Sequence, residues 1–134
     1  MQLVSTRVIT HDVARLVRFY EQVTGLDARR PAEQFAEFAG PSCTLAIGSA
    51  ETMALFGAGA AVPGSNRTAI LEFLVEDVDR EHERLVGLAV APEIVQGPST
   101  MPWGNRSLLF RDPDGNLVNF FTPLTDEARA RLAR

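Results

Sequence analysis

The stretch Met101–Phe121, MPWGNRSLLFRDPDGNLVNFF, carries the clearest fold signal in the chain. A short apolar run, Ser107–Phe110, precedes the turn-forming residues Asp112–Asn116, and a second run rich in β-formers, Leu117–Phe121, follows them. Within such a turn proline presets φ, glycine accepts a positive φ, and Asp and Asn side chains bond nearby backbone N–H groups. The stretch therefore predicts a strand, a tight turn and a second strand, which together form a β-hairpin.

The composition is that of an ordinary globular protein. The 134 residues are 46% hydrophobic and 22% charged, which is enough for the core of one domain. A net charge of −4 argues against nucleic acid or an anionic membrane as a partner. The N-terminus lacks a signal-peptide pattern, and no apolar run is long enough to span a bilayer. The single cysteine, Cys43, lies in an apolar run and is expected to be a buried, inert thiol, so we expect a reducing, cytoplasmic location.

The first half of the chain predicts one strand, one helix and three further strands. Leu3–Ile9 is an expected strand, and Val13–Thr24 is an expected helix because its apolar residues recur at helical spacing. Asp12 is the expected N-cap of this helix and Gly25 its C-terminal stop. Strands are then predicted at Gln34–Ala39, Cys43–Gly48 and Thr52–Phe56, and the basic pair Arg29-Arg30 is expected on a solvated surface.

The second half repeats this order after a connector. Gly57–Asn66 is small and turn-rich, so it is expected to link two structured parts. Thr68–Val75 is an expected strand, Asp77 an N-cap and Val78–Leu88 a helix. Three more strands are predicted at Pro92–Gln96, Asn105–Phe110 and Leu117–Thr122, and a short polar helix at Thr125–Arg134.

The order of elements is therefore βαβββ, used twice. Repeat one covers about residues 1–56, the linker 57–66, repeat two about 67–122 and a tail 123–134, all within one domain. Each copy alone would leave one face of its sheet bare. Two copies are expected to form an α+β structure: a concave, eight-stranded, partly closed, barrel-like sheet with helices outside and a ligand-sized cavity inside.

Several segments resemble the vicinal-oxygen-chelate superfamily, which includes glyoxalase I, bleomycin-resistance proteins and type I extradiol dioxygenases. The matching segments are Phe19–Leu26 at the end of the first helix, Trp103-Gly104, and Phe110–Asn116 before the last strand. With the repeat, the resemblance extends over nearly the whole chain. It implies a cup in which imidazole and carboxylate side chains hold Fe(II), Mn(II), Zn(II) or Ni(II), with open positions for vicinal oxygens of a substrate.

The family's metal-ligand positions carry other residues in this chain. Counted from the matching segments, the histidine position of the first strand falls on Ser5, that of the fifth strand on Ile70, and the usual glutamate of the last strand on Asn119. None of these is a good metal ligand, so no metal and no cofactor is predicted. His11, at a strand-to-helix turn, and His82, on a helix, are expected outside the cup.

Residues that share the inward face are the expected binding site. With a regular pleat, these are Ser5, Arg7, Ile70, Glu72, Asn119 and Phe121. Glu72 is a candidate ligand-binding or catalytic acid/base carboxylate, while a purely structural Arg7–Glu72 ion pair is equally compatible with the sequence. Trp103 and Arg106 are expected at the rim, where an indole and a guanidinium suit a planar or anionic ligand; for Trp103, interface packing is the alternative.

Two functions remain open at this point. The first is a metal-free protein that, like the bleomycin-resistance branch, binds a hydrophobic or aromatic small molecule. The second is an enzyme of the superfamily, a dioxygenase, lyase or isomerase, that uses Fe, Mn, Ni or Zn at a displaced site or Glu72 without a metal. Because open half-cups leave strand edges and apolar residues bare, a homodimer is expected in either case.

Overall fold

The computed structural model describes residues 1–55 and 57–133, and it divides the chain into two compact units, Met1–Asn66 and Arg67–Arg134. The boundary coincides with the end of the predicted connector 57–66. Each unit contains one predicted repeat and is described by itself below. That the two repeats act as a single domain stays a prediction.

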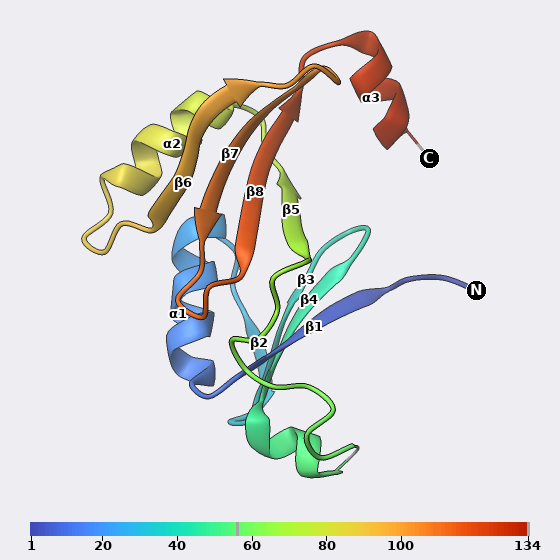
Figure 1. The fold of residues 1–134 in the computed structure, drawn as a ribbon, viewed down its shortest axis with the longest axis vertical. Helices are drawn as coiled ribbons and strands as arrows, with labels where there is room; N and C mark the ends of the chain where they lie inside the picture. Colours follow the sequence, from blue (N-terminus) through green and yellow to red (C-terminus); the bar gives the residue numbers. More distant parts are fainter. Residues whose placement is uncertain (56, 134) are drawn as a thin grey trace. The chain divides into compact units, whose positions relative to one another are not determined.

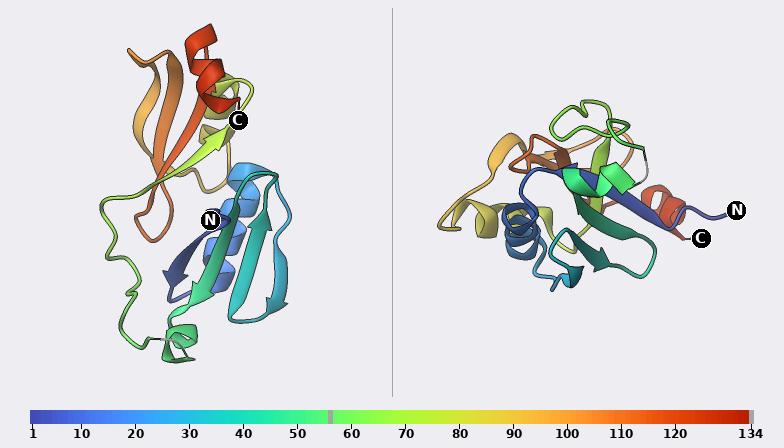
Figure 2. Two further views of the ribbon diagram at one scale, coloured as in Figure 1. Left: turned by 90° about the vertical axis from the view of Figure 1, so that its right-hand side faces the viewer. Right: turned by 90° about the horizontal axis from the view of Figure 1, so that it is seen from below.

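The first unit is a four-stranded sheet with one α-helix. Its elements are β1 (Ser5–Thr10), α1 (Val13–Thr24), β2 (Arg29–Ala32), β3 (Phe35–Ala39), β4 (Thr44–Ser49) and a 3₁₀ helix, η1 (Ala50–Leu55). The strands lie in the order β1-β4-β3-β2, with β1 parallel to β4 and the other neighbours antiparallel. α1 packs on β3 and β4, behind the strands in the left view of Figure 2. One face of the sheet is therefore covered by α1.

The sequence signals for α1 are confirmed. The Asp12 carboxylate accepts a hydrogen bond from the Arg15 backbone N–H at 3.0 Å, and Gly25 ends the helix with a φ of 71°. The apolar stripe is buried: Val13, Leu16, Val17, Tyr20 and Val23. Tyr20 lies 6.2 Å from Phe38 of β3, ring centre to ring centre. Burying a large apolar side chain contributes about 1.5–3 kcal/mol, so this stripe holds α1 on the sheet.

Two predictions for the first unit are wrong in their element. The segment predicted as a strand at Thr52–Phe56 is η1 up to Leu55, and Phe56 lies outside the described residues. The missing strand of the repeat is β2, whose four residues are all exposed. Its sequence, RRPA, shows no alternation of apolar and polar residues, and it contains Pro31, which is tolerated in edge strands. Arg29 and Arg30 do lie at the surface, as expected.

The prediction that Cys43 is buried is also wrong. The residue is exposed, and β4 begins one residue later, at Thr44. The apolar run CTLAIG therefore starts before the paired strand does. A residue that precedes the first paired residue of a strand is not covered by the adjacent strands that bury the residues after it.

The second unit repeats the topology of the first. Its elements are β5 (Ile70–Leu74), α2 (Val78–Val86), β6 (Glu93–Thr100), β7 (Asn105–Arg111), β8 (Leu117–Pro123) and α3 (Asp126–Leu132). The strand order is β5-β8-β7-β6, again with the first and last strands parallel. α2 packs on β6, β7 and β8 (Figure 1). The predicted α+β class and βαβββ duplication are confirmed. The eight strands of the described residues form two four-stranded mixed sheets, however, and not the single barrel-like sheet expected from the sequence.

The core of the second unit lies between its sheet and α2. Val78 and Leu85 of α2 are buried, and so are Leu108, Phe110, Val118 and Phe120 of β7 and β8. The rings of Phe110 and Phe120 meet edge to face with centroids 4.9 Å apart. The predicted N-cap is confirmed, because the Asp77 carboxylate accepts from the Arg80 backbone N–H at 3.1 Å.

The hairpin predicted from Met101–Phe121 is the β7–β8 pair. One Asp112 carboxylate oxygen accepts the backbone N–H groups of Asp114 and Asn116, each at 2.9 Å, and the other accepts the Asn116 side chain at 2.8 Å. Gly115 has a φ of 85°. Asp112 is 4% exposed, so this buried carboxylate is satisfied by the turn that it organises.

The β6–β7 turn has a different requirement for glycine. Gly104 has a φ of 90°, and a Cβ there would lie 2.3 Å from the Thr125 hydroxyl oxygen. That hydroxyl caps α3 by accepting the Ala128 backbone N–H at 3.1 Å. The missing side chain at Gly104 therefore lets the start of α3 pack on the turn.

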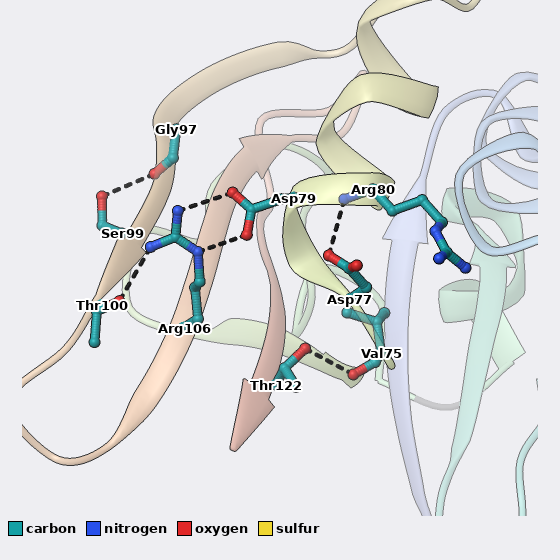
Figure 3. A network of polar contacts seen from close by, with 9 residues as sticks. All are labelled: Val75, Asp77, Asp79, Arg80, Gly97, Ser99, Thr100, Arg106 and Thr122. Carbon is teal, nitrogen blue, oxygen red and sulfur yellow. Dashed lines mark hydrogen bonds and ion pairs between the residues drawn. The ribbon is translucent and has the colours of Figure 1, made fainter. Parts of the chain in front are cut away.

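α2 is also tied to the sheet by an ion pair. Arg106 of β7 donates two hydrogen bonds to the Asp79 carboxylate, at 2.7 and 2.8 Å, and a third to the Thr100 hydroxyl at 3.0 Å (Figure 3). The hydrogen bond from Arg106 lowers the pKa of Asp79, and the same contact raises the pKa of Arg106. No helix in the described part of the chain is long and apolar enough to cross a membrane.

Replacing Gly104 by alanine is expected to destabilise the fold by about 2–5 kcal/mol, because the positive φ and the clash with Thr125 add. Gly115→Ala is the matched control: its φ is similar, but no atom lies within 4 Å of the new Cβ. We expect it to cost about 1–2 kcal/mol. Urea unfolding of both variants measures the difference, and equal losses would contradict the role given to Thr125.

Replacing Asp79 by asparagine is expected to lower the melting temperature at pH 7. Because the folded-state pKa of Asp79 is below its ordinary value, its stabilising contribution is present above about pH 4 and is lost as the pH falls through the lowered pKa. The difference between the variant and the parent should therefore shrink as the pH falls below about 4 and through the lowered pKa of Asp79.

Asp126→Asn is the matched control for this measurement. Asp126 is likewise an aspartate in the first turn of a helix, but its partner, Arg129, lies on the same helix. We expect a much smaller change in melting temperature. A pH-independent difference between Asp79→Asn and the parent would show that the ion pair is not its cause.

Candidate functional site

α2 packs on one face of the second sheet, and α3 contacts β8 of the same sheet. The face opposite α2 carries the side chains that alternate with those of the core. Side chains alternate along a strand, and paired residues of neighbouring strands share a face. Glu72 of β5 pairs with Asn119 of β8, which pairs with Leu109 of β7. The same face, called here the second open face, carries Ile70, Leu74, Leu117, Phe121, Ser107 and Arg111. The residues between them, such as Phe120 and Leu108, belong to the core under α2.

A carboxylate on the edge strand β5 and an amide on the neighbouring strand β8 form a polar pair on the second open face. The Asn119 Nδ2 donates a hydrogen bond to Glu72 Oε2 at 2.8 Å. Asn119 is 8% exposed, and its Oδ1 is buried without a hydrogen-bond donor among the described residues. A buried acceptor that stays unpaired costs about 1–3 kcal/mol. The side chain is therefore fixed on one side and unsatisfied on the other.

Apolar side chains flank this pair along the edge strand. Ile70 and Leu74 stand two residues before and after Glu72, and they are 48% and 61% exposed. Phe121, opposite Leu74, is half-buried. The second open face thus combines one polar pair with aliphatic and aromatic surface, which is the composition of a small-molecule site.

The first sheet has its own open face, built around Arg7. The Arg7 guanidinium lies over the Phe35 ring, 5.1 Å from its centroid. Between the two strands stands Gly48 of β4, where a Cβ would come within 3.6 Å of Arg7 Cδ. That distance is an ordinary van der Waals contact, so Gly48 lies directly beside the arginine side chain. Ser5, also on β1, pairs with Thr44 and is exposed.

The expected site residues therefore fall into two groups. Ile70, Glu72, Asn119 and Phe121 share the second open face, and the Glu72–Asn119 hydrogen bond brings two of them into contact. Ser5 and Arg7 share the open face of the first sheet. A single cavity lined by all six, and an ion pair between Arg7 and Glu72, involve both units and stay predictions.

The two residues expected at the rim have other surroundings. Trp103 is 58% exposed in the β6–β7 turn, and its backbone carbonyl accepts a hydrogen bond from the Arg131 guanidinium of α3. Arg106 is bound by Asp79 on the α2 side of the sheet. The next residue, Ser107, points to the opposite side, the second open face. Ligand contact by either residue stays a prediction.

Sequence reasoning missed several residues of these faces, among them Phe35, Gly48 and Leu74. Phe35 and Gly48 complete the arginine stack, and Leu74 extends the apolar strip beside Glu72. Leu74 has the same alternation as Ile70 and Glu72, so the strand pattern contained the signal. Phe35 and Gly48 follow only when the pairing of β1, β4 and β3 is known.

The metal positions implied by the family resemblance do not offer the family's donor set. Ser5 supplies a hydroxyl, Ile70 supplies no donor atom, and Asn119 supplies an amide whose nitrogen already faces Glu72. Within residues 1–55 and 57–133, no three His, Cys, Asp or Glu side chains are grouped so that they could hold a metal ion. His11 is exposed before α1, and His82 is half-buried on α2.

Comparison with known proteins agrees with this architecture. The family model "Glyoxalase/Bleomycin resistance protein/Dioxygenase superfamily" matches residues 2–120. An uncharacterized protein, YraH of Bacillus subtilis, is 30% identical, with 92% of this chain and 100% of that protein covered.

Solved structures of the same type superimpose well on the chain. A glyoxalase/bleomycin resistance protein/dioxygenase from Nocardioides has 25% identity and a TM-score of 0.76 over 94% of this chain and 85% of its own. A family enzyme from Burkholderia phytofirmans has 17% identity and a TM-score of 0.80 over 92% of this chain and 100% of its own, a likeness of fold. The match to the family model over nearly the whole chain, together with the repeated βαβββ topology, shows that the protein belongs to the glyoxalase/bleomycin resistance protein/dioxygenase superfamily.

Proposed function

We propose that this protein binds a hydrophobic or aromatic small molecule, in the manner of the bleomycin-resistance branch of its superfamily, and that it does so without a metal. The observation that carries the proposal is the second open face, where exposed Ile70 and Leu74 flank the Glu72–Asn119 hydrogen bond. Apolar surface supplies affinity, and the polar pair supplies orientation.

The residues at the family's metal positions support the metal-free part of the proposal. An aliphatic side chain at Ile70 cannot coordinate an ion, and the hydroxyl of Ser5 is a poor ligand for a transition metal. The amide of Asn119 is a weaker ligand than the carboxylate of the family, and its nitrogen is directed at Glu72. Ile70 also adds apolar surface for a ligand to cover.

An enzyme of the superfamily is the alternative function. In that case Glu72 is the catalytic acid or base, or Fe, Mn, Ni or Zn binds at a displaced site. The hydrogen bond from Asn119 favours a role for Glu72 because it fixes the carboxylate in one orientation, as a proton-transfer group requires. The metal content of the protein separates a displaced metal site from both metal-free readings.

The proposal includes a homodimer and a cytoplasmic location. Each sheet has two edge strands, and unpaired edges are commonly covered by a second chain. Exposed apolar residues on β5 add surface that an isolated chain would leave in water. Light scattering on the purified protein measures the mass in solution and tests this part.

Elemental analysis of the purified protein is expected to find no transition metal in stoichiometric amount. A screen of aromatic and aliphatic small molecules by thermal shift should find ligands that raise the melting temperature equally with and without EDTA, because binding to the native state adds stability. A stoichiometric metal, or binding abolished by EDTA, would favour the enzyme.

Replacing Leu74 by serine is expected to lower the affinity for a ligand found in that screen by about tenfold, since about 1.5 kcal/mol of apolar contact is lost. The fold should persist because Leu74 is 61% exposed. Val90→Ser makes the same kind of change at a residue that is 79% exposed in the loop after α2. Calorimetry should find ligand affinity unchanged in this control; equal weakening in both variants would contradict the placement of the site.

A further inference from the structure

The amide of Asn119 has a fixed orientation, which determines what its second group can bind. A carboxylate accepts hydrogen bonds and cannot donate them, so the Asn119 atom that faces Glu72 Oε2 at 2.8 Å is the nitrogen. The oxygen, Oδ1, consequently faces the other way. It is buried and has no donor among the described residues, while the side chain is more than nine-tenths buried. The site therefore lacks a hydrogen-bond donor.

The charge beside this oxygen is not balanced locally. Among the described residues of its own unit, Glu72 has no ion-pair partner, because Arg106 is bound by Asp79 and Arg111 donates to the Gly115 carbonyl at 3.0 Å. The second open face thus carries the exposed carboxylate of Glu72 beside the buried, unpaired Oδ1 of Asn119. Both are acceptors, and one of them carries a negative charge.

We propose that the Glu72–Asn119 pair binds the protonated amine of the ligand, and that the apolar side chains around it contact the ligand's hydrocarbon part. This inference rests on the proposed function and specifies the chemical class of its ligand. An ammonium group has three donors and one positive charge, so it satisfies Oδ1 and neutralises Glu72 together.

The neighbouring residues favour an ammonium that is attached to an apolar body. Ile70 and Leu74 stand on either side of Glu72 along β5, and Phe121 stands beside Asn119 along β8. An inorganic cation would leave these side chains uncovered. An anionic ligand on these side chains would meet the charge of Glu72 between Ile70 and Leu74, and repulsion would exclude it.

A pair of matched probes tests the inference. Calorimetric titrations of the full-length protein at pH 7 compare 2-phenylethylammonium with 2-phenylethanol, which has the same ring and chain but no charge. We expect the ammonium to bind at least about tenfold more tightly, the gain typical of one charge-assisted hydrogen bond. Phenylacetate should show no binding.

Two variants connect this preference with the pair. Glu72→Gln retains an acceptor for the Asn119 N–H and removes the charge. The affinity for the ammonium should therefore fall about tenfold, and the affinity for the alcohol should not change. Asn119→Leu should reduce the same preference by removing Oδ1. Glu83→Gln, on the exposed side of α2, is the control for loss of a carboxylate and should change the affinity for neither probe.

The results separate this inference from the proposed function. If both probes bind equally, or if Glu72→Gln weakens both alike, the ammonium site is wrong while small-molecule binding stands. If neither probe binds to the wild-type protein, both are wrong for this class of ligand. If wild type and Asn119→Leu prefer the ammonium over the alcohol by the same factor, Oδ1 does not bind the ammonium. That result would overturn the role of the amide.

Discussion

The first and last strands of each repeat pair in parallel, and the rest of the structure depends on this pairing. β1 joins β4, and β5 joins β8, although a helix and two strands separate the partners in sequence. A parallel pair needs a crossover, and the helix that follows the first strand provides it on one face of the sheet. That face becomes the core. The opposite face keeps the polar side chains that the pairing places next to each other, with Glu72 beside Asn119 as the main example.

Much of this fold is predictable because local and global signals agree. Asp12 and Asp77 are N-caps that mark where α1 and α2 begin, and the apolar stripes predict the buried faces of these helices. The turn residues Asp112–Asn116 predict the hairpin. β2 escaped prediction because its four residues are exposed and pair with one neighbour only, so burial left no pattern in the sequence. η1 escaped because a short apolar run fits a strand and a helix equally well.

The candidate site was predictable as a face and not as a set of contacts. Alternation alone places Glu72 and Asn119 on the open side of their strands, but their hydrogen bond depends on the register of β5 against β8. Arg106 shows the limit of such reasoning. It stands next to Ser107, and a step of one residue along a strand reverses the direction of the side chain, so Arg106 meets Asp79 of α2.

The exchange at position 119 is best understood together with Glu72. If the glutamate implied by the family resemblance stood at position 119, two carboxylates would lie side by side, and a metal ion or a shared proton would be needed to offset their repulsion. An amide removes one negative charge and supplies a donor, so Asn119 and Glu72 attract each other through the 2.8 Å hydrogen bond without an ion. One negative charge remains on the face. A single charge beside an unpaired carbonyl oxygen suits a monovalent ammonium better than a divalent metal, so the proposed change of ligand would follow from this one difference in side chain.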